Sequence, residues 1–482
     1  MKKIEYKWVA LSCTSLGVLF TMLDSTSLTI ALPSIMKDLN VSMNMTIWIV
    51  MIYMLTSTIL VPPLGRLADM IGKKKLYVYG CIVFTIGSFL SGISQTGLQL
   101  LIFRVVQAIG GALLVANSAP IITDAFTPNE LGKGLGINSM VFSVATVIGP
   151  LLGGLLLKLN WRYIFYINIP IGLLSAIWAG LQLKENVCVP KVKQKFDLIG
   201  TGIFTVGITL LLFALTSGAF IAWNTTTFLL MGVSVILLVI FVHIERSVRQ
   251  PMLDLKLFKD RTISLSLITV FLNCIARGAI ILLMTFYFQR VKSLDPFMCG
   301  LLLTPFAVSM VIVAPISGLL CDKRDAYAVC TIGLIISAIG FIGLSRISSD
   351  SSSIALCIWT VISGIGSGLF FTPNASAVMG AAAPEQRGIV SGIRTMMLNA
   401  GCVISIALSM ALISSGIDPA TLQGLFIGTA ASNESIAVNG FISGLRFAFI
   451  ISLVISLIAI FLSLMMGLKK APNGELSAKR EG

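Results

Sequence analysis

Charged and metal-binding side chains are scarce in this chain. Only 11% of its 482 residues are Asp, Glu, Lys or Arg, whereas 56% are hydrophobic. Water-soluble domains carry about 25% charged residues, so the composition excludes an ordinary soluble globule. The single histidine, His243, excludes a histidine-cluster metal site, and the nine cysteines lie mostly within apolar runs without the spacing of zinc ligands. We therefore predict neither a metal site nor a disulfide framework.

Catalytic signatures are lacking as well. The sequence has no Gly-x-x-x-x-Gly-Lys-Ser/Thr nucleotide-binding loop, no histidine network and no other catalytic constellation. These absences disfavour an enzyme, a bound cofactor and transport driven by ATP hydrolysis.

Long apolar runs make up most of the chain. A bilayer core roughly 30 Å thick needs about 20 apolar residues per spanning helix, and runs of that length recur from one end to the other. We predict an all-α membrane protein with fourteen transmembrane helices. Their expected ranges are 8–32, 46–64, 76–94, 98–123, 136–158, 162–183, 198–218, 226–244, 262–288, 297–320, 329–345, 354–380, 388–414 and 443–468.

The basic residues indicate how these helices are oriented. The formal net charge is +14, yet the basic residues lie in short loops and form no single patch that would bind nucleic acid. With the N-terminus inside, cytoplasmic segments hold 24 of the 34 Lys and Arg, and outer loops hold six. This bias predicts a multi-pass protein of the cell membrane with both termini in the cytoplasm.

Two motifs occur twice at almost the same offset. The pattern Pro-x-x-Gly-x-x-x-Asp at residues 62–69 recurs 253 residues later at 315–322, and Pro-x-x-x-Gly at 128–132 recurs 256 residues later at 384–388. Eight predicted helices separate the copies, so both copies have the same orientation in the membrane. This is the parallel repeat of transporters built from two six-helix halves.

Six plus six helices leave the seventh and eighth as an inserted pair. We predict an N-terminal six-helix bundle at 1–190, the inserted pair at 191–255 and a C-terminal six-helix bundle at 256–482. One outer loop, at about 415–442, is long, and the sequence leaves open whether it covers the outer mouth or is a mobile connection.

Five segments carry a resemblance to a known family. Residues 65–75 (GRLADMIGKKK) resemble the signature loop of the major facilitator superfamily, and residues 104–111 (RVVQAIGG) resemble its helix-4 motif. Residues 149–154 (GPLLGG) are similar to the helix-5 motif of its antiporter branches. Residues 23–33 and 161–172 look like the fourteen-helix drug:H⁺ antiporter family. The resemblance implies two six-helix major-facilitator bundles plus an inserted helix pair.

The first of these motifs is expected to form a conformational latch. Glycines permit close packing and tight turns, and an acidic side chain can face the positive N-terminus of a helix. The resemblance implies a latch at the cytoplasmic side, while the three lysines that follow Gly72 would also fix the topology. The expected latch residues are Gly65, Asp69, Gly72, Lys73 and, in the second copy, Asp322.

The helix-5 motif removes side chains from one helix face and removes a backbone donor at its proline. Small residues let neighbouring helices approach closely, so the run serves either tight packing alone or a rocking interface. In antiporters the resemblance implies a seal against leak. The residues concerned are Gly149, Pro150, Gly153 and Gly154.

An acid inside a membrane helix is the most informative single residue. Such a group costs about 2.5–3.5 kcal/mol on insertion scales, so Asp24 should face the bundle interior and have a partner. Arg104 is the expected partner, because both residues lie about 9–14 Å below the outer boundary. Burial favours the protonated acid, whereas a nearby arginine favours the carboxylate. The pair is expected to couple transport to protons; the alternative is a permanent structural ion pair.

Other polar residues within the runs are candidates for the substrate pathway. In helices, amides serve equally well as hydrogen-bonding links between neighbours. Arg277 lies deep in its run, and the predicted second half embeds no acid to pair with it, so it either attracts an anionic group or extends toward the interface. The candidates are Gln107, Asn117, Asn138, Asn273, Arg277 and Asn399.

Together these features predict a secondary transporter. The leading expectation is proton-coupled export of small amphipathic or drug-like compounds, with a small-molecule substrate, protons and the lipid bilayer as partners. The excess of buried arginines over acids favours an organic anion or zwitterionic metabolite as the alternative cargo, and a non-transporting receptor is a remote third class. We expect no catalytic residue and a monomer.

Overall fold

A computed structural model describes residues 5–41, 43–185, 196–220, 224–248, 251–294, 296–414 and 434–467. Within these ranges the chain is helical and has no strand. Fourteen helical segments are long and apolar enough to cross a membrane, which confirms the predicted number of spanning helices. The all-α membrane fold predicted from the apolar runs is therefore correct.

The described chain forms two compact units. The first contains residues 1–214, 224–255 and 379–399, and the second contains 215–223, 256–378 and 400–482. This grouping follows packing and not repeat order, and the division into bundles 1–190, 191–255 and 256–482 stays a prediction.

The first unit contains the N-terminal helices and the beginning of a late one. Its elements are α1 (Tyr6–Asp38), α2 (Met43–Ile71), α3 (Lys73–Ile93), α4 (Gly97–Ala125), the 3₁₀ turn Pro128–Glu130, α5 (Leu131–Leu157), α6 (Tyr163–Tyr166), α7 (Asn168–Gln182), most of α8 (Leu198–Phe220), α9 (Thr225–Ser247), the 3₁₀ turn Pro384–Gln386 and the first half of α15 (Arg387–Ser414).

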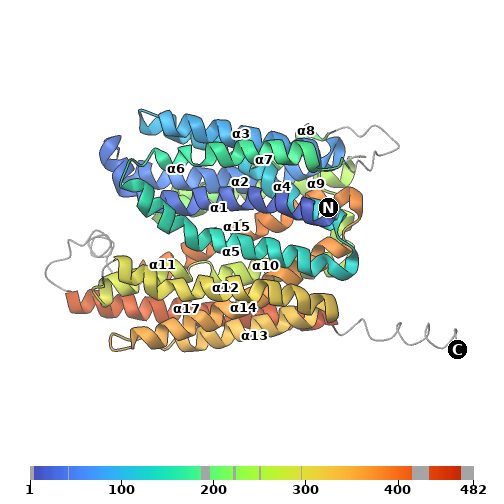
Figure 1. Cartoon of the computed structure of the whole chain (residues 1–482). Helices are drawn as coiled ribbons and strands as arrows, with labels where there is room; N and C mark the ends of the chain where they lie inside the picture. The colour runs from blue at the N-terminus through green and yellow to red at the C-terminus, as the bar shows by residue number, and fades with distance from the viewer. Residues whose placement is uncertain are drawn as a thin grey trace. The chain divides into compact units, whose positions relative to one another are not determined.

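Close helix packing fixes the interior of the first unit. Helix α4 packs against α1, α2 and α3 (Figure 1). Gly87 on α3 lies against the backbone of Gln107, and Gly110 on α4 lies against the backbone of Phe84, so neither position has room for a Cβ. Phe20 and Phe84 meet edge to face with ring centroids 4.9 Å apart. This packing holds the polar face of α4 against α1.

The second unit contains the C-terminal helices. Its elements are α10 (Arg261–Arg277), α11 (Ile280–Phe286), the π-helical turn Tyr287–Val291, α12 (Pro296–Lys323), α13 (Ala326–Leu344), α14 (Ser353–Ala381), the remainder of α15 and α17 (Glu434–Gly467). Helix α17 packs against α10 and α13 (Figure 1).

Several predicted spans differ from the structure. The spans expected at 8–32 and 46–64 belong to longer helices, Tyr6–Asp38 and Met43–Ile71, and the span at 162–183 is divided into α6 and α7. The span expected at 262–288 is divided into α10, α11 and a π-helical turn, with a break at Gly278 and Ala279. The last span begins at Glu434 and not at 443, so the helix takes in the end of the predicted outer loop. Residues 415–433 of that loop lie outside the described residues.

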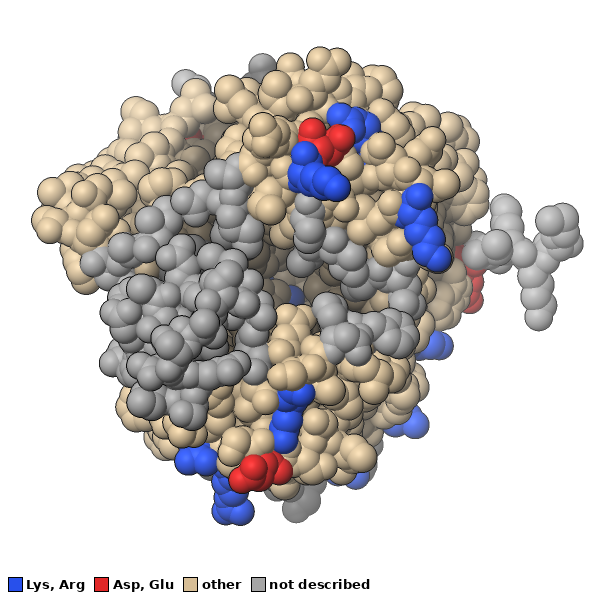
Figure 2. All heavy atoms as spheres, turned by 90° about the vertical axis from the view of Figure 1, so that its left-hand side faces the viewer, with Lys and Arg blue, Asp and Glu red and all other residues tan. Residues whose placement is uncertain are grey.

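In the space-filling view of Figure 2, basic and acidic groups are scattered among wide areas of other residues. One surface ion pair at the end of α1 joins Arg162 to Asp38, with Arg162 Nη1 donating to Asp38 Oδ2 over 2.7 Å.

Candidate functional site

The candidate site lies inside the first unit, where α1, α4 and α7 meet. Helix α4 begins at Gly97 because Thr96 caps it, accepting a hydrogen bond from the Gln99 backbone N–H. Arg104 and Gln107 follow on this helix and, three residues apart, share one face. They face Asp24 of α1, and Asn168, the first residue of α7, completes the group.

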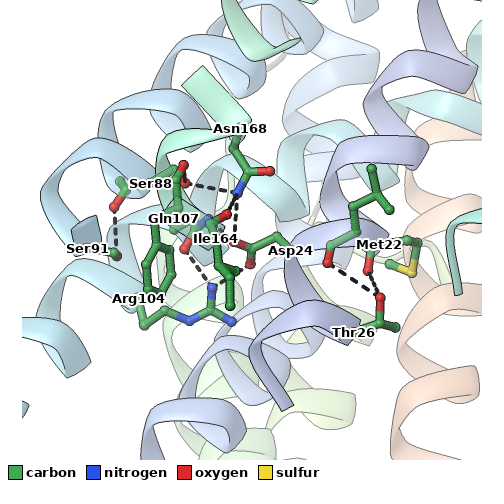
Figure 3. Close-up of polar contacts among 12 residues, drawn as sticks. Met22, Asp24, Thr26, Ser88, Ser91, Arg104, Gln107, Ile164 and Asn168 are labelled. Carbon is green, nitrogen blue, oxygen red and sulfur yellow. Dashed lines mark hydrogen bonds and ion pairs between the residues drawn. The ribbon is translucent and has the colours of Figure 1, made fainter. Parts of the chain in front are cut away.

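The Asp24 carboxylate accepts three hydrogen bonds (Figure 3). Arg104 Nη1 donates to Asp24 Oδ2 over 2.5 Å. Gln107 Nε2 and Asn168 Nδ2 both donate to Asp24 Oδ1, over 2.9 and 2.8 Å. A guanidinium and two amide donors are the partners that an ionised carboxylate needs. The structure thus brings Asp24 and Arg104 together and adds Gln107 to the pair.

Burial makes the hydrogen bonds and the ion pair of this network important for stability. Asp24 and Arg104 are each 1% exposed, and Gln107 and Asn168 are fully buried. The guanidinium carbon of Arg104 lies 4.4 Å from the ring centroid of Tyr53. Away from water, a charge is tolerated only when it is paired and hydrogen-bonded. Removing either Asp24 or Arg104 would therefore leave the other as a buried, unpaired charge, which lowers the stability of the fold.

Sequence reasoning missed Asn168 and Ser88. Asn168 Nδ2 also donates to Ser88 Oγ over 3.0 Å, which ties α3 into the network. Asn168 belongs to the 161–172 segment that carried the family resemblance, and this was the available signal. Among the described atoms, Asn168 Oδ1 and Arg104 Nε have no hydrogen-bond partner.

The helix-5 glycines pack against α1 directly beside Asp24. Ser27 Oγ donates to the Gly149 carbonyl over 2.7 Å, and Gly149 and Gly153 lie so close to α1 that a Cβ at either would meet Thr26 or Ser27. A Cβ at Gly154 would meet nothing, so this glycine is not part of the contact. Pro150 lies within α5, and its side chain is outside the described part of the chain.

A second polar cluster lies at the end of the first unit where α2 ends and α15 begins. Asp69 Oδ1 accepts from the Gly388 N–H over 2.9 Å, and Asp69 Oδ2 accepts from the Ile389 N–H over 3.0 Å. These are orphan donors in the first turn of α15, where the helix dipole favours an anion. Gly65 permits this approach, because a Cβ there would collide with the Gly388 carbonyl.

Asp124 is the centre of this second cluster and was not predicted. Lys73 Nζ lies 2.7 Å from Asp124 Oδ2, and Arg387 Nη1 lies 2.6 Å from Asp124 Oδ1. Gly72 forms the turn before Lys73 with a φ of +118°, which a side chain would strain. Asp322 lies on α12, in the other compact unit.

The remaining pathway candidates are dispersed. Asn117 Nδ2 donates to the Leu113 carbonyl within α4, a bond that links no helices. Asn138 and Asn399 are half-buried on α5 and α15. Asn273 and Arg277 lie together on α10 in the second unit. Gln107 is the member of the predicted set that joins Asp24.

A match to a known protein family identifies the family of this chain. The model described as Major Facilitator Superfamily matches residues 14–245 and 266–482. The chain belongs to the major facilitator superfamily. It is a multi-pass membrane transporter and not an enzyme.

Known members of the superfamily resemble the chain over most of its length. A riboflavin transporter, RibZ of Clostridioides difficile, is 32% identical over 86% of this chain and 88% of its own length. The multidrug transporter protein MdtP of Bacillus subtilis is 31% identical over 83% of this chain and 74% of its own. The structure of the human organic anion transporter MFSD10 superimposes with a TM-score of 0.66 at 13% identity, covering 95% of this chain and 99% of that one. The last likeness concerns the fold alone.

Proposed function

We propose that this transporter exports small molecules in exchange for protons by alternating access. The observation that carries the proposal is the buried Asp24 carboxylate, which accepts from Arg104, Gln107 and Asn168. A buried acid with a single charged partner can exist ionised when paired or neutral when protonated. If substrate or a helix movement draws Arg104 away, Asp24 takes up a proton, and when the pair re-forms the proton leaves.

Two further features of the first unit, the latch contacts and the helix-5 glycines, fit this cycle. The bonds from Asp69 to the N-terminus of α15 and the Lys73–Asp124–Arg387 cluster act as the latch in one state. The helix-5 glycines beside Asp24 let α5 move against α1 while the seal is kept. The bias of lysine and arginine toward the predicted cytoplasmic segments supports an orientation with both termini in the cytoplasm, and the proposed transporting unit is a monomer.

The cargo is a small amphipathic or drug-like compound. Relatives named as multidrug transporters support this class. An organic anion or zwitterionic metabolite is the second candidate, and Arg277 favours it. Among the described residues, no carboxylate lies within 4.0 Å of the Arg277 guanidinium, so this cation is available to a ligand.

Purified protein in proteoliposomes tests the coupling. An acidic lumen should drive ethidium into the vesicles against its own gradient, because proton efflux through inverted molecules supplies the free energy. Ethidium is permanently charged and does not follow a pH gradient unaided. Nigericin, which collapses the pH gradient, should abolish the accumulation. Accumulation that persists with nigericin, or that follows a sodium gradient instead, would contradict proton coupling.

The latch yields a separate prediction. In Asp69→Asn, one of the two charge-assisted bonds to α15 is lost, and such bonds contribute about 1.5–3 kcal/mol. We expect the latched state to lose population about 10-fold or more, with a corresponding drop in transport rate. Asp325→Asn is the matched control, because this exposed acid precedes α13 without capping it. Equal effects of both variants would remove Asp69 from the latch.

A further inference from the structure

The second unit holds a partly buried polar face near the middle of a membrane span. Asn273 and Arg277 lie four residues apart on α10, so they share one face of the helix. The span runs from Arg261 to Gln289, and both residues lie near its centre. Transporter substrate sites form near the bilayer midplane. A ligand site on this face presupposes the proposed transport function.

Asn273 is buried without a partner. The side chain is 0% exposed, and neither Oδ1 nor Nδ2 has a hydrogen-bond partner among the described residues. A buried amide normally satisfies both atoms, because an unmet donor or acceptor away from water is destabilising. By contrast, the buried Asn374 of α14 donates to the Ser266 carbonyl over 2.9 Å. Asn273 thus has one acceptor and one donor group that no described residue satisfies.

The neighbouring guanidinium is held by an aromatic ring. Arg277 Cζ lies 4.4 Å from the ring centroid of Phe371 on α14. The Phe371 ring attracts the charge but offers no oxygen or nitrogen acceptor, so this contact leaves the Arg277 N–H groups for acceptors elsewhere. Arg277 Nε is buried and has no partner among the described atoms.

The helix is interrupted directly after Arg277. Helix α10 ends there, and α11 begins at Ile280. The Ala279 N–H donates to Ser405 Oγ of α15 over 2.9 Å, which replaces a bond within the helix. Interrupted helices at mid-membrane depth are typical of transporter binding sites. The break gives this segment a local freedom that a continuous helix lacks.

These observations select the ligand by its hydrogen-bonding edge. A carboxylate offers acceptors only, so it would satisfy Arg277 and Asn273 Nδ2 but leave Asn273 Oδ1 unmet. An imide or ureide edge, in which an N–H lies between two carbonyls, satisfies all three groups at once. A flat ring that carries such an edge can also extend the stack of Arg277 on Phe371. We propose that Asn273, Arg277 and Phe371 bind a planar heteroaromatic ligand through its imide or ureide edge.

Riboflavin is a suitable probe, because its ring system carries this edge and is fluorescent. Binding to the full-length protein in nanodiscs is followed by fluorescence quenching, without any gradient. N3-methylriboflavin, in which the N–H is blocked, should bind about 10- to 100-fold more weakly, since Asn273 Oδ1 then loses its donor. Equal affinity for the two compounds would overturn the proposal.

Substitutions of Asn273 and Arg277 test whether these residues contact the imide edge of the ligand. Asn273→Leu should weaken riboflavin binding about 10- to 100-fold and weaken N3-methylriboflavin binding by a smaller factor, because only the bond from Asn273 Nδ2 remains to be lost there. Arg277→Lys should also weaken riboflavin binding, because lysine lacks the planar fork. Arg446→Lys is the matched control, since Arg446 donates to the Ile347 carbonyl elsewhere in the unit, and its riboflavin affinity should equal the wild type.

Thermal unfolding without ligand separates binding from structure. Asn273→Leu removes two unpartnered polar atoms, so the ligand-free midpoint should stay the same or rise. A lower midpoint with unchanged riboflavin affinity would show a structural amide and contradict the proposal. Riboflavin that binds as expected but is not moved by a pH gradient would contradict proton coupling alone. Gradient-driven ethidium transport without discrimination between the two flavins would contradict the imide site alone.

Discussion

Asp24→Asn is expected to abolish uphill transport in proteoliposomes, leaving no more accumulation under a pH gradient than empty vesicles show. Asparagine keeps the size of the side chain, and its Oδ1 can still accept from Arg104, so we expect a protein that folds and binds ligand but is less stable, because the buried Arg104 charge is then unpaired. It cannot gain or lose a proton, so nothing links the gradient to the movement of substrate. Downhill exchange of substrate across the membrane should persist, because it needs no net proton transfer.

A second acid on the same helix provides the control. The Arg162 guanidinium and the Trp161 indole N–H beside Asp38 hold the pKa of that carboxyl below its usual value, so Asp38 is charged at neutral pH. Unlike Asp24, it lies at the exposed end of α1. Asp38→Asn removes the same charge from the same helix, and we expect coupled transport to continue. Coupled transport in Asp24→Asn at the wild-type rate would exclude Asp24 from the mechanism.

The features that follow from local chain chemistry were predictable. Fourteen apolar runs yield fourteen spanning helices because a single segment can satisfy its own backbone hydrogen bonds in a bilayer only as a helix. The pairing of Asp24 with Arg104 was predictable from depth alone, since a lone acid and a lone arginine at the same level are strongly driven to meet. Their burial together at 1% exposure accords with that reasoning.

The features that depend on tertiary context were not predictable. Asp124 and Arg387 are 263 residues apart, and each looks like an ordinary charge at a helix end until packing brings them to 2.6 Å. The break after Arg277 leaves no mark in the hydrophobic pattern, because Gly278 and Ala279 are themselves apolar and the missing bond comes from Ser405 of another helix. Asn168 was visible in a motif, but its contact with Asp24 depends on how α7 packs.

Arg104→Met is expected to cause the largest loss of stability. It leaves the Asp24 carboxyl buried with two amide donors and no counter-charge, so the group either stays an unpaired charge or must take up a proton to fold. Removing one partner of a buried pair costs about 3–5 kcal/mol. The thermal unfolding midpoint in detergent should fall well below that of the wild type. Methionine fills much of the same volume beside Tyr53, so the loss reports charge and not a cavity.

The double variant Asp24→Asn/Arg104→Met decides what the pair is for. Neutralising both partners removes the unpaired charge, so stability should recover most of what Arg104→Met loses, and the two effects should be far from additive. Transport distinguishes the two explanations of the pair. If it were only a structural link, a stable neutral pair would restore coupled transport along with the fold. Because proton exchange needs the carboxyl itself, we expect a variant that folds, binds ligand and exchanges substrate downhill, yet does not respond to a pH gradient.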